Sequence, residues 1–70
     1  MTVRQYNLLE RAIARRLRVV VHRRGAELVI RPRALVLRGG REVSETVQPA
    51  TGDAMTIYLD EIEAFEIVDE

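Results

Sequence analysis

The hydrophobic pattern changes its period near residue 18. Before that point the apolar residues recur with the spacing of one helical stripe, at Tyr6, Leu9, Ile13 and Leu17. Thr2 is a candidate N-cap for this helix, because its hydroxyl can accept from a backbone N–H of the first turn. The pattern therefore predicts a helix over about residues 3–18.

Beyond residue 18 the chain alternates or carries β-branched runs, which is typical of strands. The segments are 18–23, 27–31, 34–38, 42–48, 55–59 and 64–68. Arg24-Gly25 and Gly39-Gly40 are turn signals, and residues 60–62 suit a single 3₁₀ turn. Pro32 cannot donate to a ladder, so it marks an edge, a bulge or a break. The expected faces are defined by four pairs: Leu35 with Leu37, Val43 with Val47, Ile57 with Leu59, and Phe65 with Ile67.

One helix followed by short strands with short connections predicts a fold of the α+β class that is mainly β. We expect an N-terminal helix and a five-stranded antiparallel barrel of the SH3-like or Sm-like type, with the helix covering one open end. The whole chain, residues 1–70, is expected to be one domain, with the helix over about 3–18 and the barrel over about 19–70.

The composition fits a small core built from aliphatic residues. Hydrophobic residues make up 47% of the 70 positions and aromatic residues only 4%. A chain of this length buries a modest share of its surface, so self-association would add stability. Cysteine is absent, which excludes disulfides and thiolate zinc sites. Neither a signal peptide nor a long apolar run is visible, so we expect a soluble, cytoplasmic protein with no membrane partner.

Charge is sorted along the chain. All 11 basic residues are arginines between Arg4 and Arg41, and nine carboxylates but no base follow from Glu42 to Glu70. With Glu10 and Glu27, the first 41 residues carry 11 − 2 = +9 and the remainder −9. Such asymmetry bears on partners and self-association.

From Leu9 onward the chain resembles the WYL domain, an Sm-like barrel found mostly in bacterial transcriptional regulators. The matching stretches are Ala12-Ile13, Val19-Val20-Val21-His22, Val29-Ile30-Arg31-Pro32 with Leu35, Gly39-Gly40, and Thr56 through Ile62. The resemblance implies transcription regulation through ligand sensing, in which a basic pocket binds nucleic acid or a nucleotide-like effector.

The chain departs from this family at its binding positions. Glu42-Val43-Ser44 stands where the Trp-Tyr-Leu signature is expected, and Met55 and Glu61 replace two arginines. Glutamate in an anion pocket repels a phosphate. The sequence alone leaves open whether these changes abolish ligand binding, and the fold carries over better than the site.

The candidate residues for binding nucleic acid or another anion are Arg4, Arg11, Arg15, Arg18, Arg23 and Arg31. The first four share the helix face opposite the apolar stripe. A second basic group comprises Arg23, Arg24, Arg31, Arg33, Arg38 and Arg41. For this group we expect ion pairs, within or between subunits, with Glu42, Glu45, Glu63 or Glu66, and binding of nucleic-acid phosphates is the alternative. Tyr58 is expected to point outward, where its ring packs over a strand neighbour, which is the favoured interpretation, or stacks on a base.

The sequence carries no motif for catalysis, metal binding or a cofactor. His22 has no second histidine or cysteine to complete a metal site, and Asp60, Glu61 and Glu63 lack the spacing of a divalent-ion loop. Ser44 and Thr46 have no recognisable base nearby in sequence. We therefore expect a protein that is not an enzyme and that uses no cofactor or metal.

Two functional hypotheses follow. The first is a WYL-like binding module whose arginine face holds nucleic acid or a nucleotide-like ligand. The second is a module for protein–protein interaction or homo-oligomeric assembly, such as a homodimer, in which the basic half of one chain meets the acidic half of another.

Overall fold

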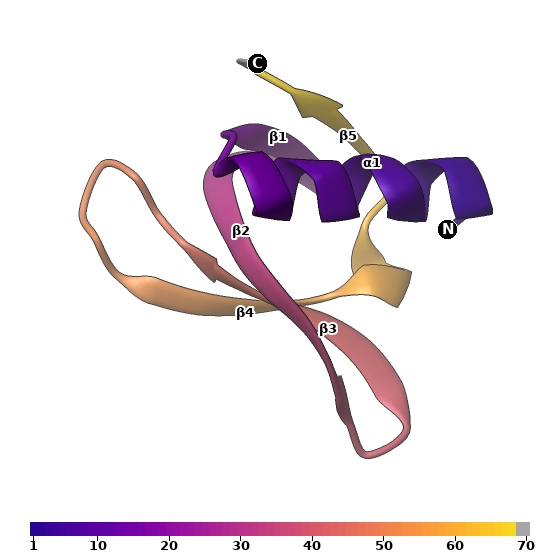
Figure 1. Cartoon of the computed structure of the whole chain (residues 1–70). Coiled ribbons are helices and arrows are strands. Elements are labelled where there is room, and N and C mark those ends of the chain that lie inside the picture. Colours follow the sequence, from indigo (N-terminus) through magenta and orange to yellow (C-terminus); the bar gives the residue numbers. More distant parts are fainter. Residues whose placement is uncertain (69–70) are drawn as a thin grey trace.

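A helix and a curled antiparallel sheet make up the computed structural model, which describes residues 1–68 (Figure 1). Helix α1 spans Val3–Arg15 and is followed by strands β1 (Val19–Arg23), β2 (Ala26–Arg38), β3 (Arg41–Val47), β4 (Ala54–Tyr58) and β5 (Ala64–Ile67). A 3₁₀ turn, η1 (Leu59–Glu61), connects β4 to β5. The predicted class, one N-terminal helix and a five-stranded antiparallel sheet, is confirmed.

Helix α1 begins as predicted and ends earlier than predicted. The Thr2 hydroxyl accepts a hydrogen bond from the Gln5 N–H, and the Gln5 side chain accepts one from the Thr2 N–H, which forms a capping box. The helix ends at Arg15, not near residue 18, because Arg16 adopts the left-handed conformation with φ of 57°. The Leu17 N–H then donates to the Ala12 carbonyl, as in a Schellman motif. This turn brings Leu17 into the core.

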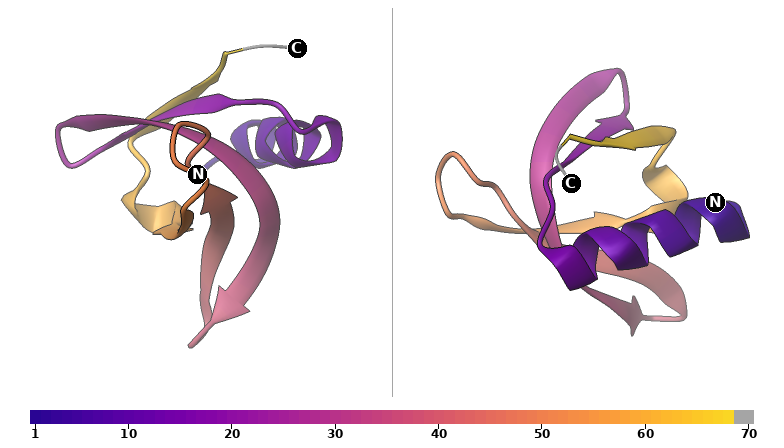
Figure 2. Two further views of the ribbon diagram at one scale, coloured as in Figure 1. Left: turned by 90° about the vertical axis from the view of Figure 1, so that its left-hand side faces the viewer. Right: turned by 45° about the horizontal axis from the view of Figure 1, so that its top comes forward.

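The sheet has the strand order β4-β3-β2-β1-β5. Strand β2 belongs to both of its halves, because residues 26–30 pair with β1 and residues from Arg31 onward pair with β3. The register shifts between Pro32 and Ala34. Of the three alternatives for Pro32, the structure therefore has a bulge within one long strand. A bulge sharpens the bend of a strand, and β2 curves strongly in Figures 1 and 2.

The expected closure into a barrel is not observed in residues 1–68. Strand β5 pairs with β1, and β4 pairs with β3. No ladder joins β4 to β5 in the described part of the chain. Between these strands the chain turns through η1, after which the Glu63 N–H donates to the His22 carbonyl at the β1 edge. The sheet is therefore curled and open.

The core lies between α1 and the concave side of the sheet. Its buried cluster consists of Ala12, Leu17, Val19, Val21, Ile30 and Ile57. Half-buried residues that pack against it include Leu28, Met55, Phe65 and Ile67. Of the predicted helical stripe, Leu9 and Leu17 are buried, whereas Tyr6 and Ile13 are half-buried. The inward positions predicted in β4 and β5 are confirmed by this packing.

Strand β3 presents its two buried hydroxyl residues, Ser44 and Thr46, to the helix side of the sheet. Ser44 pairs with Ile57 and Thr46 with Met55, so each hydroxyl shares a face with a core residue. Val43 pairs with Tyr58 and lies on the opposite face, where it is also buried. The alternation around Val43 and Val47 therefore marks the face turned away from the helix.

Candidate nucleic-acid interface

The predicted binding arginines do not form one surface. Arg4, Arg11 and Arg15 lie on the outer side of α1, opposite Leu9 and Ala12, and are exposed. Arg18 lies beyond the helix end and is half-buried, so the predicted four-residue helical row is shorter than expected. Of the remaining two residues, only Arg23 lies in a separate cluster. Arg31 is exposed on β2, whereas Arg23 belongs to a cluster beside η1.

That cluster is a set of ion pairs around Glu61. The Glu61 carboxylate lies 3.0 Å from an Arg24 nitrogen, 3.7 Å from an Arg23 nitrogen and 3.9 Å from an Arg41 nitrogen. Strands β1, β3 and the β1–β2 turn supply the arginines, and η1 supplies the carboxylate. Glu61, which replaces an arginine of the WYL pattern, is thus surrounded by positive charge and acts as an internal anion.

Arg41 makes the most extensive contacts in this cluster. Its Nε and Nη2 donate to the two Asp60 carboxylate oxygens at 3.0 and 2.7 Å. Such a two-point pair is geometrically specific. The hydrogen bond with Asp60 raises the pKa of Arg41, and the same bond lowers the pKa of Asp60. The guanidinium also lies 3.9 Å from the centroid of the Tyr58 ring. Tyr58 is half-buried beneath Arg41, so this ring face is not open to a base.

Intramolecular pairing of the second basic group is partly confirmed. Arg38 pairs with Glu45 at 3.2 Å, as one of the predicted partners. The other pairs use Asp60 and Glu61, which are not among the partners predicted from the sequence. In residues 1–68, Glu42, Glu63 and Glu66 form no ion pair with a described arginine. Four arginines consequently form ion pairs within the molecule, namely Arg23, Arg24, Arg38 and Arg41, and they share three carboxylates.

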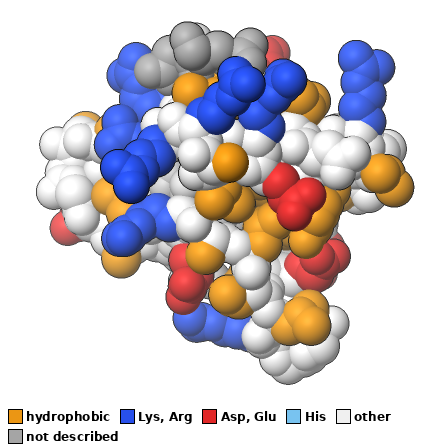
Figure 3. Space-filling view, viewed as in Figure 1, with side chains coloured by type: hydrophobic (Ala, Val, Ile, Leu, Met, Phe, Trp, Pro, Cys, Tyr) orange, Lys and Arg blue, Asp and Glu red, His pale blue; other side chains and the backbone are white. Residues whose placement is uncertain are grey.

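A different set of arginines exposes its positive charge to solvent. Among the described residues, five exposed arginines form no ion pair: Arg4, Arg15, Arg16, Arg31 and Arg33. Ile30 pairs with Val19, so Arg31 lies close to the segment that joins α1 to β1. Arg33 follows at the β2 bulge. We call Arg15, Arg16, Arg31 and Arg33 the arginine patch. Figure 3 shows basic side chains gathered along α1 and over the left side, where α1 ends and β2 bends.

Two members of this patch were absent from the predicted site. On a continuous helix Arg16 would share the side of Leu9 and Ala12, but its left-handed conformation ends the helix there and leaves Arg16 exposed. Arg33 was assigned to ion pairing with β-strand carboxylates. The bulge at Pro32 removes it from the regular ladder. No glycine marks the helix end at Arg16, whereas Pro32 marks the site of the bulge without distinguishing it from an edge or a break.

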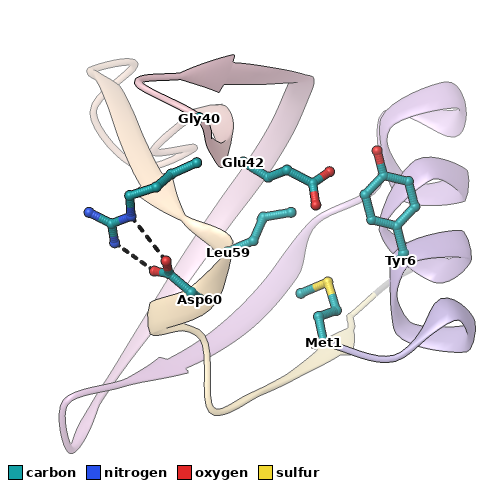
Figure 4. A pocket seen from close by; sticks show the side chains of 7 residues that line it. Met1, Tyr6, Gly40, Glu42, Leu59 and Asp60 are labelled. Atoms are coloured by element: carbon teal, nitrogen blue, oxygen red, sulfur yellow. Dashed lines mark hydrogen bonds and ion pairs between the residues drawn. The ribbon is translucent and has the colours of Figure 1, made fainter.

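A polar pocket of about 310 Å³ lies between the start of α1 and the β2–β3 turn (Figure 4). Its wall includes Tyr6, Glu42, Leu59 and Asp60, and Glu42 points across it toward Tyr6. Loss of solvation raises the pKa of the Tyr6 hydroxyl, and the charges of Glu42 and Glu10 raise it further. The Glu42 carboxylate is unsuited to a phosphate, and Arg41, the base in the lining, is paired with Asp60, so this pocket is not the anion site.

The other altered WYL positions are structural. Val43 and Ser44 are buried within β3, and Met55 packs against the core. His22 lies with its Nδ1 at 3.7 Å from Glu27. Within residues 1–68 no three residues among His, Cys, Asp and Glu are grouped as a metal site would require. No helix in this part of the chain has both the length and the apolar character of a membrane span.

Comparisons with known proteins leave the family open. The WYL assignment therefore remains a prediction from the residues quoted above. Searches against protein-family models, curated proteins and solved structures found no match to this chain.

Proposed function

We propose that this chain is a WYL-like, non-enzymatic binding module that holds the phosphate backbone of single-stranded nucleic acid on the arginine patch. The observation that carries the proposal is the division of the arginines. Those beside η1 form ion pairs with Asp60 and Glu61, whereas Arg15, Arg16, Arg31 and Arg33 are exposed and form no ion pair with the described residues.

The chemistry of the patch favours recognition of phosphate over recognition of bases. Guanidinium groups offer forked donors that match phosphate oxygens. Base reading on a small β-rich domain usually needs exposed aromatic rings. Tyr58 is covered by Arg41, and Tyr6 faces Glu42 at the far end of α1. We therefore infer binding that depends weakly on sequence and strongly on salt.

The test is a salt titration of oligonucleotide binding, measured by fluorescence anisotropy. Each phosphate contact on single-stranded nucleic acid contributes about −0.7 to the slope of log K against log salt, so four contacts predict a slope of about −3. The double variant Arg15→Gln with Arg31→Gln should halve that slope.

The matched control is Arg24→Gln with Arg38→Gln, which removes the same charge from arginines that are paired internally. This control should keep the wild-type slope. Equal losses in both double variants would show that net charge alone attracts the strand. Absence of binding at low salt would refute the proposal outright.

A further inference from the structure

A second surface lies along the side of α1 that faces the β2–β3 hairpin. Two adjoining hollows, which share Tyr6 and Leu35, form a groove there: one is lined by Glu10, Ile13 and Ala14, and the other by Leu37 and Glu42. We call it the Tyr6 groove. Leu37 is 70% exposed although it lies on the same strand face as the half-buried Leu35, because the hairpin extends past the helix that covers Leu35. In Figure 3 apolar and acidic side chains meet below α1.

The carboxylates of this groove are left without basic partners. Among the described residues, Glu10 and Glu42 form no ion pair, in contrast to Glu45, Asp60 and Glu61. The groove therefore combines exposed apolar surface with unneutralised negative charge. An occupant that fits it has apolar side chains flanked by a cation.

The first turns of α1 carry that combination on their outer side. Val3 is 78% exposed, and together with Arg4, Asn7 and Leu8 it lines a shallow depression. Arg4 forms no ion pair with the described residues. We call Val3, Arg4 and Leu8 the outer turn. It is apolar and basic, whereas the Tyr6 groove is apolar and acidic.

We propose that the Tyr6 groove binds the outer turn of a second copy of this chain. Both halves of the contact occur on one molecule, each with an apolar side chain more than two-thirds exposed and each with charge opposite to the other. A copy of the same chain is thus the partner that satisfies both surfaces together. A reciprocal two-fold contact gives a dimer, and a one-way contact gives a longer assembly.

The outer turn is separate from the nucleic-acid surface. Arg4 and Arg15 are 11 positions apart on α1, which corresponds to about 16 Å along the helix axis. Assembly and nucleic-acid binding are therefore expected to fail independently when the two ends are mutated.

The test measures self-association by analytical ultracentrifugation at low salt over a range of concentrations. Glu42→Arg and Arg4→Glu should each weaken self-association by at least about tenfold, because each places like charges in contact. When the two single variants are mixed, the groove of the Arg4→Glu chain meets the outer turn of the Glu42→Arg chain with native charges. The mixture should therefore associate as the wild type does.

Matched reversals away from the contact are the controls. Glu63→Arg and Arg15→Glu alter the same charges at exposed positions outside it and should leave self-association unchanged, while Arg15→Glu weakens oligonucleotide binding. Leu37→Ser removes an exposed apolar side chain from the Tyr6 groove and so tests the apolar part of the contact. Circular dichroism checks that each variant is folded. A monomeric wild type, a mixture that stays monomeric, or association indifferent to Glu42 and Arg4 would overturn the proposal.

Discussion

Ser44 and Thr46 are two hydroxyl residues in similar surroundings with different hydrogen bonding. Both are buried on the helix side of β3. The Thr46 hydroxyl donates to the Met55 carbonyl at 3.0 Å. The Ser44 hydroxyl, at 1% residue exposure, has no hydrogen-bond partner in residues 1–68. A buried polar group without a partner opposes folding.

Replacing these hydroxyls should therefore change stability in opposite directions. Ser44→Ala is expected to raise the free energy of unfolding by about 1 kcal/mol, and Thr46→Val to lower it by a similar amount. Urea denaturation followed by circular dichroism measures both. A loss of stability in Ser44→Ala would mean that its hydroxyl is satisfied in solution.

The Asp60–Arg41 pair makes stability depend on pH in the acid range. The hydrogen bond from Arg41 lowers the pKa of Asp60 in the folded chain, relative to about 3.9 for an unfolded aspartate. The contribution is therefore complete at neutral pH and is lost as the pH falls through the folded-state pKa. Because Asp60 is exposed, the effect is small.

Asp60→Asn should be less stable than the wild type at neutral pH, and the difference should shrink to zero in strong acid. Thermal unfolding at several pH values measures this difference. Glu63→Gln, at an exposed carboxylate without an ion pair in the described residues, is the control and should track the wild type. A constant difference at every pH would exclude the ionised pair as its cause.

At the level of elements, the sequence predicts the N-terminus of α1 more clearly than its C-terminus. The N-terminus has a sequence signal, because Thr2 and Gln5 are spaced for reciprocal capping. The C-terminus lacks the usual glycine, and Arg16 takes the left-handed conformation in its place. An L-residue other than glycine adopts that conformation at a cost in free energy.

Arg16→Gly is therefore expected to raise the free energy of unfolding by about 1 kcal/mol. The neighbouring change Arg15→Gly, inside the helix, should lower it by about the same amount. The comparison holds the chemical change constant and varies only the backbone conformation. Thermal unfolding of both variants measures it, and equal signs would contradict the observed helix end.

Periodicity predicts elements well wherever one face of an element contacts the core. Strands β1, β3, β4 and β5 agree with prediction to within one or two residues for this reason, since Ile57 and Phe65 keep the alternation visible, whereas the two segments predicted on either side of Pro32 form the single strand β2. Pro32 was ambiguous because proline is compatible with an edge, a bulge or a break. The choice depends on β3, whose Thr46 and Glu45 pair on either side of the bulge.

At the scale of the whole molecule, charge was the part that the sequence could not resolve. The separation of arginines and carboxylates along the chain indicated ion pairs within the molecule. The pair of Arg38 with Glu45 could be predicted, because these residues lie on the adjacent strands β2 and β3. The contact of Arg24 with Glu61 joins positions 37 residues apart. Such a pair is set by how η1 folds against the β1–β2 turn. The arginine patch can be identified only after the arginines that form these ion pairs are set aside.

The shared strand β2 has a consequence for how this small sheet unfolds. It is the one strand in residues 1–68 that is paired in both halves, with β1 on one stretch and β3 on the other. Detaching either half exposes backbone groups along β2 and removes the curvature that holds α1 over Ile30 and Ile57. Because β2 is continuous, the two halves of the open sheet are expected to unfold together, as the strands of a closed barrel do. The bulge at Pro32 is the point at which the two halves join.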